Sequence, residues 1–257
     1  MDDFRFRGRH VREFGAVAAF GDSMRFGGKV QRGEYGLPGG GSVLIGEDEW
    51  QPTQRSVVLL PADGVEADGS WRRALCAWLQ AGRGEMIVDN DPDVILIAQF
   101  DLDGTFEHRG WPAGSLVLNM TLQPLAYDVL STQRTVRAEA GQEIATSLDM
   151  ACPLSVPLCV TVKPAGNALT RVRLSVGGSV VDLPHLLLEK GQILEYDAGM
   201  FLGDPTDLRV NGVTDFSPAQ GGSWARLTLN PESGVICVLV EGGAADVMIS
   251  ARGRWPA

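Results

Sequence analysis

Apolar and polar residues alternate along most of the second half of the chain, which is the pattern of strands with one buried face. The clearest run covers residues 154–162, and four later segments repeat the period of two. Turn formers separate these segments, and Asn211-Gly212 after Val210 is typical of a tight hairpin. The sequence therefore predicts an antiparallel β-sandwich here. The alternating apolar residues are Leu154, Val156, Leu158, Val160, Val162, Val172, Leu174, Val176, Leu208, Val210, Ala225, Leu227, Leu229, Val247, Ile249 and Ala251.

One segment of the first half, residues 69–100, begins with a different period. Four apolar residues have the spacing of one helical face, which predicts a helix over about 70–81 with these side chains in the core. Ser70 is expected to cap the start of this helix and Gly82 to end it. The four core residues are Trp71, Leu75, Trp78 and Leu79.

Two strand-like runs, 85–88 and 94–100, follow this helix directly. The five residues between them are too rich in turn formers for a strand, so the sequence predicts a hairpin with a loop at 89–93. Four of these residues are strongly polar and form the expected hairpin tip: Asp89, Asn90, Asp91 and Asp93.

The remainder of the first half is predicted as strands joined by turns, with a glycine-rich loop at 21–41 and a turn at 101–104. A domain junction is placed in the polar segment 127–143, which has no strong period. The sequence thus predicts a mainly β protein. An N-terminal β domain with one α-helix and a β-hairpin occupies 1–130, and an antiparallel β-sandwich occupies 131–257, of which 131–143 is a linker. Further strands are predicted at 4–7, 42–45, 55–60 and 116–122.

Charge and composition exclude several classes of function. The 257 residues include 32 acids and 22 Lys plus Arg, a formal net charge of −10, and no long basic cluster. Binding to nucleic acid or to an anionic membrane by electrostatics is therefore disfavoured. Apolar runs of about six residues are too short to span a bilayer, and arginines interrupt the N-terminus where a secretory signal would need an apolar core. A cytosol-like compartment of synthesis is expected.

No motif in the chain predicts catalysis, a cofactor or a metal. Gly28-Lys29 lacks the glycine and hydroxyl residues of a phosphate loop, and no G-x-S-x-G elbow occurs. Asp89, Asp91 and Asp93 have the spacing of calcium ligands, but Val94 replaces the bending glycine and Phe100 the closing glutamate. A solvated tip is the preferred interpretation. The sequence places no partner beside any of the three histidines, His10, His108 and His185, so they are interpreted as structural or solvated. The four cysteines, Cys76, Cys152, Cys159 and Cys237, are interpreted as small buried side chains. A disulfide between Cys152 and Cys159 is left open.

Six tryptophans leave one alternative open, because exposed indoles stack on sugar rings. A carbohydrate-binding β-sandwich module would use Trp111, Trp224 or Trp255 as stacking platforms. Binding to a glycan array would favour this alternative over a structural role.

The order of short motifs along nearly the whole chain resembles that of the distal tail proteins of long-tailed (siphovirus-type) bacteriophages. An F-x-F-x-G strand is followed by an aromatic-glycine turn, then by the helix and its acidic hairpin, and later by a Leu-Asn-Pro-x-x-Gly turn. The segments that carry this resemblance are 4–8, 13–15, 77–79, 122–127, 189–197, 210–212, 229–234 and 252–255.

The resemblance implies a structural virion protein at the tail tip, made in the cytoplasm of the host bacterium. In that family six copies form a ring at the distal end of the tail tube, with the N-terminal domain building the ring and a galectin-like sandwich facing outward. The implied partners are the chain itself, the tail tube protein, a tail-tip hub or tail-associated lysin-like protein and a receptor-binding protein. DNA only passes through the lumen, and no membrane partner is implied. The hairpin tip at Asp89 to Asp93 is expected to face solvent, the lumen or a neighbouring subunit.

One departure limits this resemblance. Sugar-binding galectins carry an H-x-N-x-R strand, whereas His185 is followed by Leu186, Leu187 and Leu188. The sandwich is therefore expected to serve as a docking platform without that sugar site, in a ring of the minimal type because its connections are short.

Overall fold

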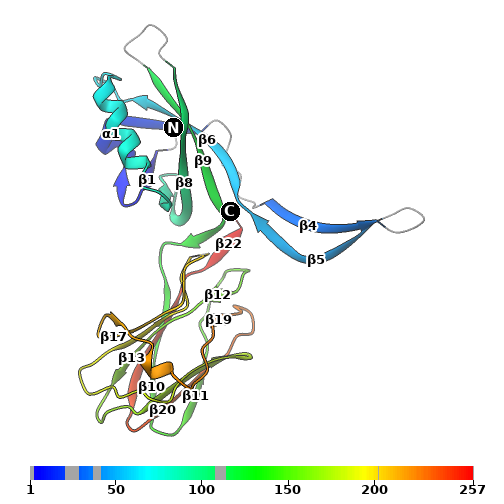
Figure 1. The fold of residues 1–257 in the computed structure, drawn as a ribbon, viewed down its shortest axis with the longest axis vertical. Helices are drawn as coiled ribbons and strands as arrows, with labels where there is room; N and C mark the ends of the chain where they lie inside the picture. The colour runs from blue at the N-terminus through cyan, green and yellow to red at the C-terminus, as the bar shows by residue number, and fades with distance from the viewer. Residues whose placement is uncertain (1–2, 21–28, 37–41, 108–113, 202, 257) are drawn as a thin grey trace. The chain divides into compact units, whose positions relative to one another are not determined.

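The computed structural model describes residues 3–20, 29–36, 42–107, 114–201 and 203–256 (Figure 1). The chain divides into two compact units, which are described separately. The first comprises residues 1–129 together with 256–257, and the second comprises residues 130–255.

The first unit contains one large antiparallel sheet with strands in the order β2-β1-β7-β8-β9-β6-β3, and a separate ribbon in which β4 pairs with β5 (Figure 1). The predicted loop at 21–41 was wrong for residues 29–36, which form β4. The elements are β1 (Phe4–Phe6), β2 (Arg9–His10), the 3-10 helix η1 (Val11–Phe14), β3 (Ala16–Phe20), β4 (Lys29–Gly36), β5 (Ser42–Gln51), β6 (Thr53–Pro61), α1 (Gly69–Leu79), β7 (Gly84–Val88), β8 (Asp91–Glu107) and β9 (Ser115–Asp128).

Helix α1 buries one face against aromatic side chains of the sheet. The indole of Trp78 stacks on Phe14 with ring centroids 4.4 Å apart and on Phe4 at 5.9 Å, and its Nε1–H donates to the carbonyl of Phe6 at 3.1 Å. Phe100 of β8 also packs against Phe4 and Phe6, with ring centroids 5.7 Å and 5.0 Å apart. The buried residues of the helix are Trp71, Leu75, Trp78 and Leu79.

The helix begins one residue earlier than its predicted cap. Asp68, in extended conformation, accepts a hydrogen bond from the N–H of Trp71 at 2.8 Å, so the predicted cap Ser70 was wrong. The hydroxyl of Ser70 instead donates to the Asp68 carboxylate at 2.7 Å. This carboxylate takes the capping position because it satisfies a free N–H of the first turn and complements the positive end of the helix.

The hairpin after the helix is tighter than predicted. Residues 91–93 lie in β8, and the paired residues Val88 and Asp91 leave Asp89 and Asn90 as the turn, so the predicted five-residue loop was wrong. The predicted turn at 101–104 also lies within β8, where the register against β9 shifts between Asp101 and Thr105. The turn-forming residues of this segment form an irregularity within β8, which changes the direction of the strand without ending it.

The second unit is a β-sandwich. Its six-stranded sheet has the order β10-β21-β13-β16-β17-β18, its four-stranded sheet has the order β11-β20-β14-β15, and β12 pairs with β19 (Figure 1). The elements are β10 (Thr132–Ala138), β11 (Glu143–Thr146), β12 (Val156–Pro157), β13 (Cys159–Pro164), β14 (Arg171–Val176), β15 (Ser179–Leu183), β16 (Leu194–Asp197), β17 (Asp207–Val210), β18 (Val213–Thr214), the 3-10 helix η2 (Ser217–Ala219), β19 (Thr228–Leu229), β20 (Ile236–Glu241) and β21 (Ala245–Ala251). The last strand, β22 (Arg254–Pro256), pairs with β9 and belongs to the large sheet.

The alternating apolar residues of these strands form one continuous core. Val160, Val162, Val172 and Leu174 are fully buried or nearly so, and their polar neighbours in sequence point outward. The hairpin predicted at Asn211-Gly212 is confirmed, because both residues have positive φ (53° and 77°) between β17 and β18. The predicted linker at 131–143 was wrong, since residues 132–138 form β10 and pair with β21 along their whole length.

These observations confirm the prediction of a mainly β protein with a sandwich in its second half. Within the described residues α1 is the only α-helix, and it has 11 residues. No helix in this part of the chain combines the length and apolar character required to cross a bilayer.

Candidate assembly and binding surfaces

The turn between β7 and β8 is fastened to the beginning of the chain. The ring Nε2 of His10 lies 3.1 Å from the carboxylate of Asp89, and the Asp89 N–H donates to the carbonyl of Asp3 at 2.9 Å. The His10 Nδ1 accepts from the N–H of Arg12 at 3.2 Å. With Nδ1 as the acceptor, Nε2–H is the donor to Asp89.

A buried carboxylate holds the other side of this turn in place. Asp3 is 3 % exposed, and its carboxylate accepts hydrogen bonds from the N–H of Ala18 at 2.9 Å and from the guanidinium of Arg12. A buried carboxylate with a positive partner and a backbone donor avoids the cost of burying an isolated charge. The paired carboxylate of Asp3 thereby connects β1, η1 and β3 at the base of the turn.

The predicted tip residues therefore differ in environment. Asp89, Asn90 and Asp93 are exposed, whereas Asp91 is half-buried at the start of β8. The pairing of Asp89 with His10, 79 residues apart in sequence, was missed because no local pattern connects them. Among the described residues, no group of three or more His, Cys, Asp and Glu side chains is placed to hold a metal ion.

The large sheet of the first unit has partly exposed aliphatic side chains on the face that α1 does not cover. The paired residues Val17 and Leu60 lie on this face, as do Ala19, Val58 and Val117, which pair across β3, β6 and β9. All five are half-buried. We call these five residues the aliphatic patch. Further along the same face the residues become polar, at Ser56, Asn119, Gln54 and Thr121.

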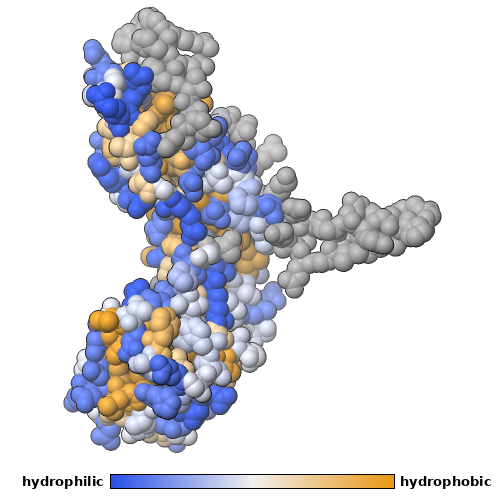
Figure 2. Space-filling view, viewed as in Figure 1, coloured by the Kyte–Doolittle hydropathy of each residue, from blue (hydrophilic) through white to orange (hydrophobic). Residues whose placement is uncertain are grey.

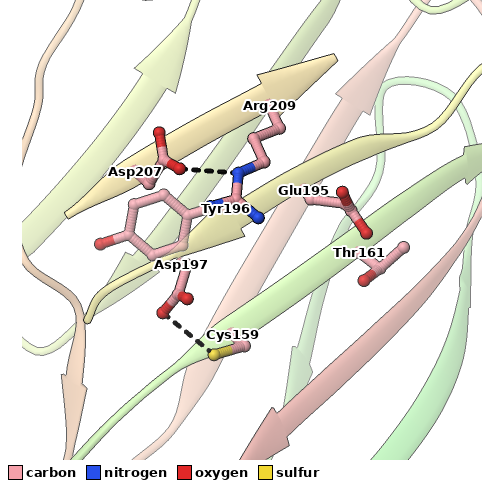
Figure 3. Close-up of a pocket in the computed structure, with 7 residues that line it drawn as sticks. All are labelled: Cys159, Thr161, Glu195, Tyr196, Asp197, Asp207 and Arg209. Atoms are coloured by element: carbon pink, nitrogen blue, oxygen red, sulfur yellow. Dashed lines mark hydrogen bonds and ion pairs between the residues drawn. The ribbon is translucent and has the colours of Figure 1, made fainter. Parts of the chain in front are cut away.

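A polar hollow of about 140 Å³ lies on the outer face of the six-stranded sheet in the second unit (Figure 3). Apart from the core residue Tyr196, its lining residues alternate along three neighbouring strands, because the paired residues of β13, β16 and β17 share this face. Asp207 accepts from the Nε–H of Arg209 at 2.7 Å and from the hydroxyl of Thr214 at 3.2 Å. The lining residues are Cys159, Thr161, Glu195, Tyr196, Asp197, Asp207 and Arg209.

Cys159 and Tyr196 are potential nucleophiles of this hollow, and burial raises the pKa of each to about 12, which opposes reactivity. Burial, together with the neighbouring Asp197 carboxylate, raises the pKa of the Cys159 thiol to about 12. Its Sγ–H donates to Asp197 at 3.2 Å, so the thiol acts as a donor in a side-chain network. At neutral pH the group is protonated, and the hollow thus offers hydrogen-bonding groups without an activated nucleophile.

The polar residues of the hollow were missed because only the apolar residues of each strand were interpreted. The same alternation, taken at the intervening positions, would have placed Glu195 and Asp197 beside Asp207 and Arg209. The other candidate residues have varied outcomes. His108 and Trp111 lie outside the described residues, Trp255 packs against the sandwich core, and all four cysteines are free thiols.

Comparison of the whole chain with solved structures identifies its fold. The crystal structure of the Dit protein (gp 19.1) of phage SPP1 matches with a TM-score of 0.70 over 99% of this chain and 99% of that chain, at 11% sequence identity. Its authors describe it as a paradigm of the hub adsorption apparatus in phages that infect Gram-positive bacteria. The match covers both units, so the chain has the fold of a phage distal tail protein from end to end.

Chains of the phage p2 baseplate in its activated conformation also match. The structure with Ca gives a TM-score of 0.52 and the structure with Sr gives 0.54, each at 9% identity and over 98% of both chains. No protein-family model matches the sequence. No curated protein matches it significantly either. The similarity is therefore one of fold. The sequence identities are too low to assign the roles of individual residues in those proteins to residues of this chain.

Proposed function

We propose that this chain is a structural protein of a bacteriophage tail, of which six copies form a ring at the distal end of the tail tube. The observation that carries the proposal is the match to the SPP1 Dit protein over 99% of both chains. Both sets of matching structures are tail or baseplate components, and none is described as an enzyme. A shared order of two β units over the matched length supports a shared architectural role.

The first unit has a surface suited to self-association. A sheet that faces water on one side normally carries polar residues there, whereas the aliphatic patch exposes parts of Val17, Val58, Leu60 and Val117. Contact with a second copy would remove this apolar area from water. We therefore assign the ring contact to the first unit, residues 1–130 as predicted, and the outward position to the sandwich.

The hairpin turn has a proposed place in the same ring. Its exposed side chains, Asp89, Asn90 and Asp93, are held on a fixed base by Asp3 and His10. A rigid polar turn of this kind suits a contact with a neighbouring subunit or a position on the wall of the channel. Carboxylates on the wall would repel the phosphates of passing DNA, in agreement with the net charge of −10.

A ring located between the tail tube and the tail tip would contact further proteins on both sides. One side of the ring would contact the tail tube protein, and the other a tail-tip hub or lysin-like protein, with a receptor-binding protein attached at the sandwich. The polar hollow between Glu195 and Arg209 offers donors and acceptors for such an attachment. The protein would then be located in the virion, at the tail tip, after synthesis in the bacterial cytoplasm.

The test is the mass and shape of the purified chain. Light scattering coupled to size exclusion, with negative-stain images, should show a six-fold ring. Val58→Glu places a charge in the aliphatic patch and should reduce the mass towards that of one chain. Ser56→Glu is the matched control, because Ser56 is exposed on the same strand and the same face. It should leave the mass unchanged.

Two results would contradict the proposal. A strictly monomeric wild-type chain, both alone and with the tail tube protein added, would exclude the ring. If Val58→Glu still forms the ring and its circular dichroism is unchanged, the aliphatic patch is not part of the contact between subunits, and another surface must form that contact.

A further inference from the structure

The large apolar side chains that are exposed within the described residues all belong to the second unit. Hydrophobic surface on one face of this unit is visible as orange in Figure 2. Two of them are aromatic and touch each other: Trp224 is 38% exposed and Phe216 is 45% exposed. Their ring centroids are 5.4 Å apart, and their planes meet at 83°. The two rings therefore form a right-angled corner at the surface, which we call the aromatic corner.

The aromatic corner rests on a fixed support. Tyr196, 1% exposed, packs edge-on against Trp224 with ring centroids 5.5 Å apart. Its hydroxyl donates to the carbonyl of Ala225 at 2.7 Å and accepts from the N–H of Leu227 at 2.9 Å. Both partners belong to the segment that carries Trp224. Tyr196 therefore holds the indole through the ring contact and holds the backbone of its segment through these two hydrogen bonds. A ligand would meet a preorganised surface, with little side-chain ordering left to oppose binding.

Polar groups accompany the corner in the same segment. Asp215 directly precedes Phe216, and its carboxylate accepts the Ser217 N–H at 2.9 Å. This backbone hydrogen bond, with one from the Ser217 side chain, lowers the pKa of Asp215, which is therefore an anionic acceptor at neutral pH. Ser223 and Gln220 are also exposed and supply further donors and acceptors. The aromatic corner thus combines apolar faces with polar groups.

This combination fits a saccharide better than a protein. A pyranose presents C–H groups on its ring faces, which pack against the electron-rich face of an indole, and hydroxyl groups at its edge, which need donors and acceptors. A specific protein interface buries about 800 Å² on each partner, far more than two partly exposed rings provide. The net charge of −10 and the adjacent Asp215 disfavour anionic sugars.

We propose that Trp224 and Phe216 form a binding site for neutral saccharides on the sandwich. The site does not depend on ring formation, since all its residues lie in one unit of one chain. Trp224, one of the tryptophans considered as stacking platforms, lies at the surface and contacts an aromatic partner. The site does not use the H-x-N-x-R pattern of sugar-binding galectins, which the sequence lacks.

The test uses the full chain on an array of neutral oligosaccharides, followed by titration of the best binder by tryptophan fluorescence and calorimetry. Trp224→Ala and Phe216→Ala should each weaken binding by about tenfold or more, and Trp224→Phe should retain part of it because an aromatic face remains. Val213→Ala is the matched control, since Val213 is exposed in the same region but has no ring. Circular dichroism should be unchanged for all four variants.

Three outcomes would overturn the assignment. The wild-type chain could bind no neutral saccharide on the array, or it could bind one equally well after Trp224→Ala and Phe216→Ala. Alternatively, Trp224→Ala could lower the mass of the assembly while no saccharide binds, which would make the aromatic corner a contact between copies. Ring formation is read by light scattering and saccharide binding by the array, so failure of one proposal is distinguishable from failure of the other.

Discussion

At the scale of single residues, burial decides what a side chain can do more than its chemical type does. Cysteine is a nucleophile in many proteins, yet Cys159 is half-buried beside a carboxylate that stabilises its protonated form. Tryptophan is equally dependent on its position, because Trp78 is buried beneath the sheet whereas Trp224 lies at the surface. The helical spacing around Trp78 predicted its place in the core, whereas the exposure of Trp224 and its contact with Phe216 are known only from the structure.

The first residue-scale prediction concerns the Cys159 thiol. With a pKa of about 12 it should react with iodoacetamide at pH 8 about a thousand-fold more slowly than the same thiol in urea, because the thiolate reacts and the thiol does not. Mass spectrometry of the alkylated peptides measures both rates. Asp197→Asn should accelerate the native reaction, since it removes the neighbouring negative charge. Equal rates in the folded and unfolded chain would show that the side chain is freely accessible and unperturbed.

The second concerns Trp78, whose indole contacts Phe4, Phe6 and Phe14 and donates to a backbone carbonyl. Trp78→Ala should lower the free energy of unfolding by about 3–5 kcal/mol, because a large side chain is removed from a closely packed site. Urea denaturation followed by circular dichroism measures this loss. Ala74→Ser, on the exposed face of α1, is the control and should change stability by about 0.5 kcal/mol or less. If Trp78→Ala lowered the free energy of unfolding by no more than the Ala74→Ser control does, the indole would lie outside the core.

At the scale of secondary-structure elements, periodicity predicted the strands better than turn composition predicted their ends. Alternating apolar residues correctly located β13, β14 and β21, because a buried face imposes a period of two. Turn-forming residues at 91–93 and 101–104 nevertheless lie inside β8, because the residues that flank them pair with β7 and β9 and outweigh local preference. Residues 132–138 have few large apolar side chains, yet they form an edge strand on β21.

An ion-pair group on the four-stranded sheet gives the element-scale prediction. Arg171 of β14 lies 2.8 Å from Asp182 of β15 and 3.2 Å from Glu241 of β20. The hydrogen bond from Arg171 lowers the pKa of Asp182 below its ordinary 3.8, so the folded state holds this carboxylate ionised. The stabilisation is therefore fully present above pH 3.8 and is lost as the pH falls through the lower folded-state pKa.

Asp182→Asn should consequently lower stability at pH 7, by about 1 kcal/mol or less for a partly exposed pair. The difference from the wild-type chain should shrink as the pH falls below 3.8. Urea midpoints measured between pH 7 and pH 2.5 report it. The comparison variant is Asp246→Asn, whose partner Arg137 belongs to an exposed pair on the other sheet. A constant difference across this pH range would mean that Asp182 stabilises the sheet through something other than its charge.

At the scale of the whole molecule, the fold was accessible from the sequence, whereas the aliphatic patch and the polar hollow were not. Strand spacing and motif order predicted a mainly β chain with the fold of a distal tail protein, which the match over 99% of the chain confirms. The sites depend on residues that are distant in sequence. The aliphatic patch joins β3, β6 and β9, and the polar hollow joins β13, β16 and β17. Such surfaces are set by strand pairing, which local periodicity does not specify.

The last prediction separates the roles of the two units. The fragment 130–255 contains both sheets of the sandwich and its complete apolar core, from Ala138 to Ala251, with Trp255 packed against it. A unit with its own core should fold alone, so the fragment should unfold in a single cooperative thermal transition and bind saccharide as the full chain does. It lacks the aliphatic patch, and light scattering should therefore give the mass of one fragment. A fragment that assembles to six copies would instead transfer the ring contact to the sandwich, because no residue of the first sheet would then be required for assembly.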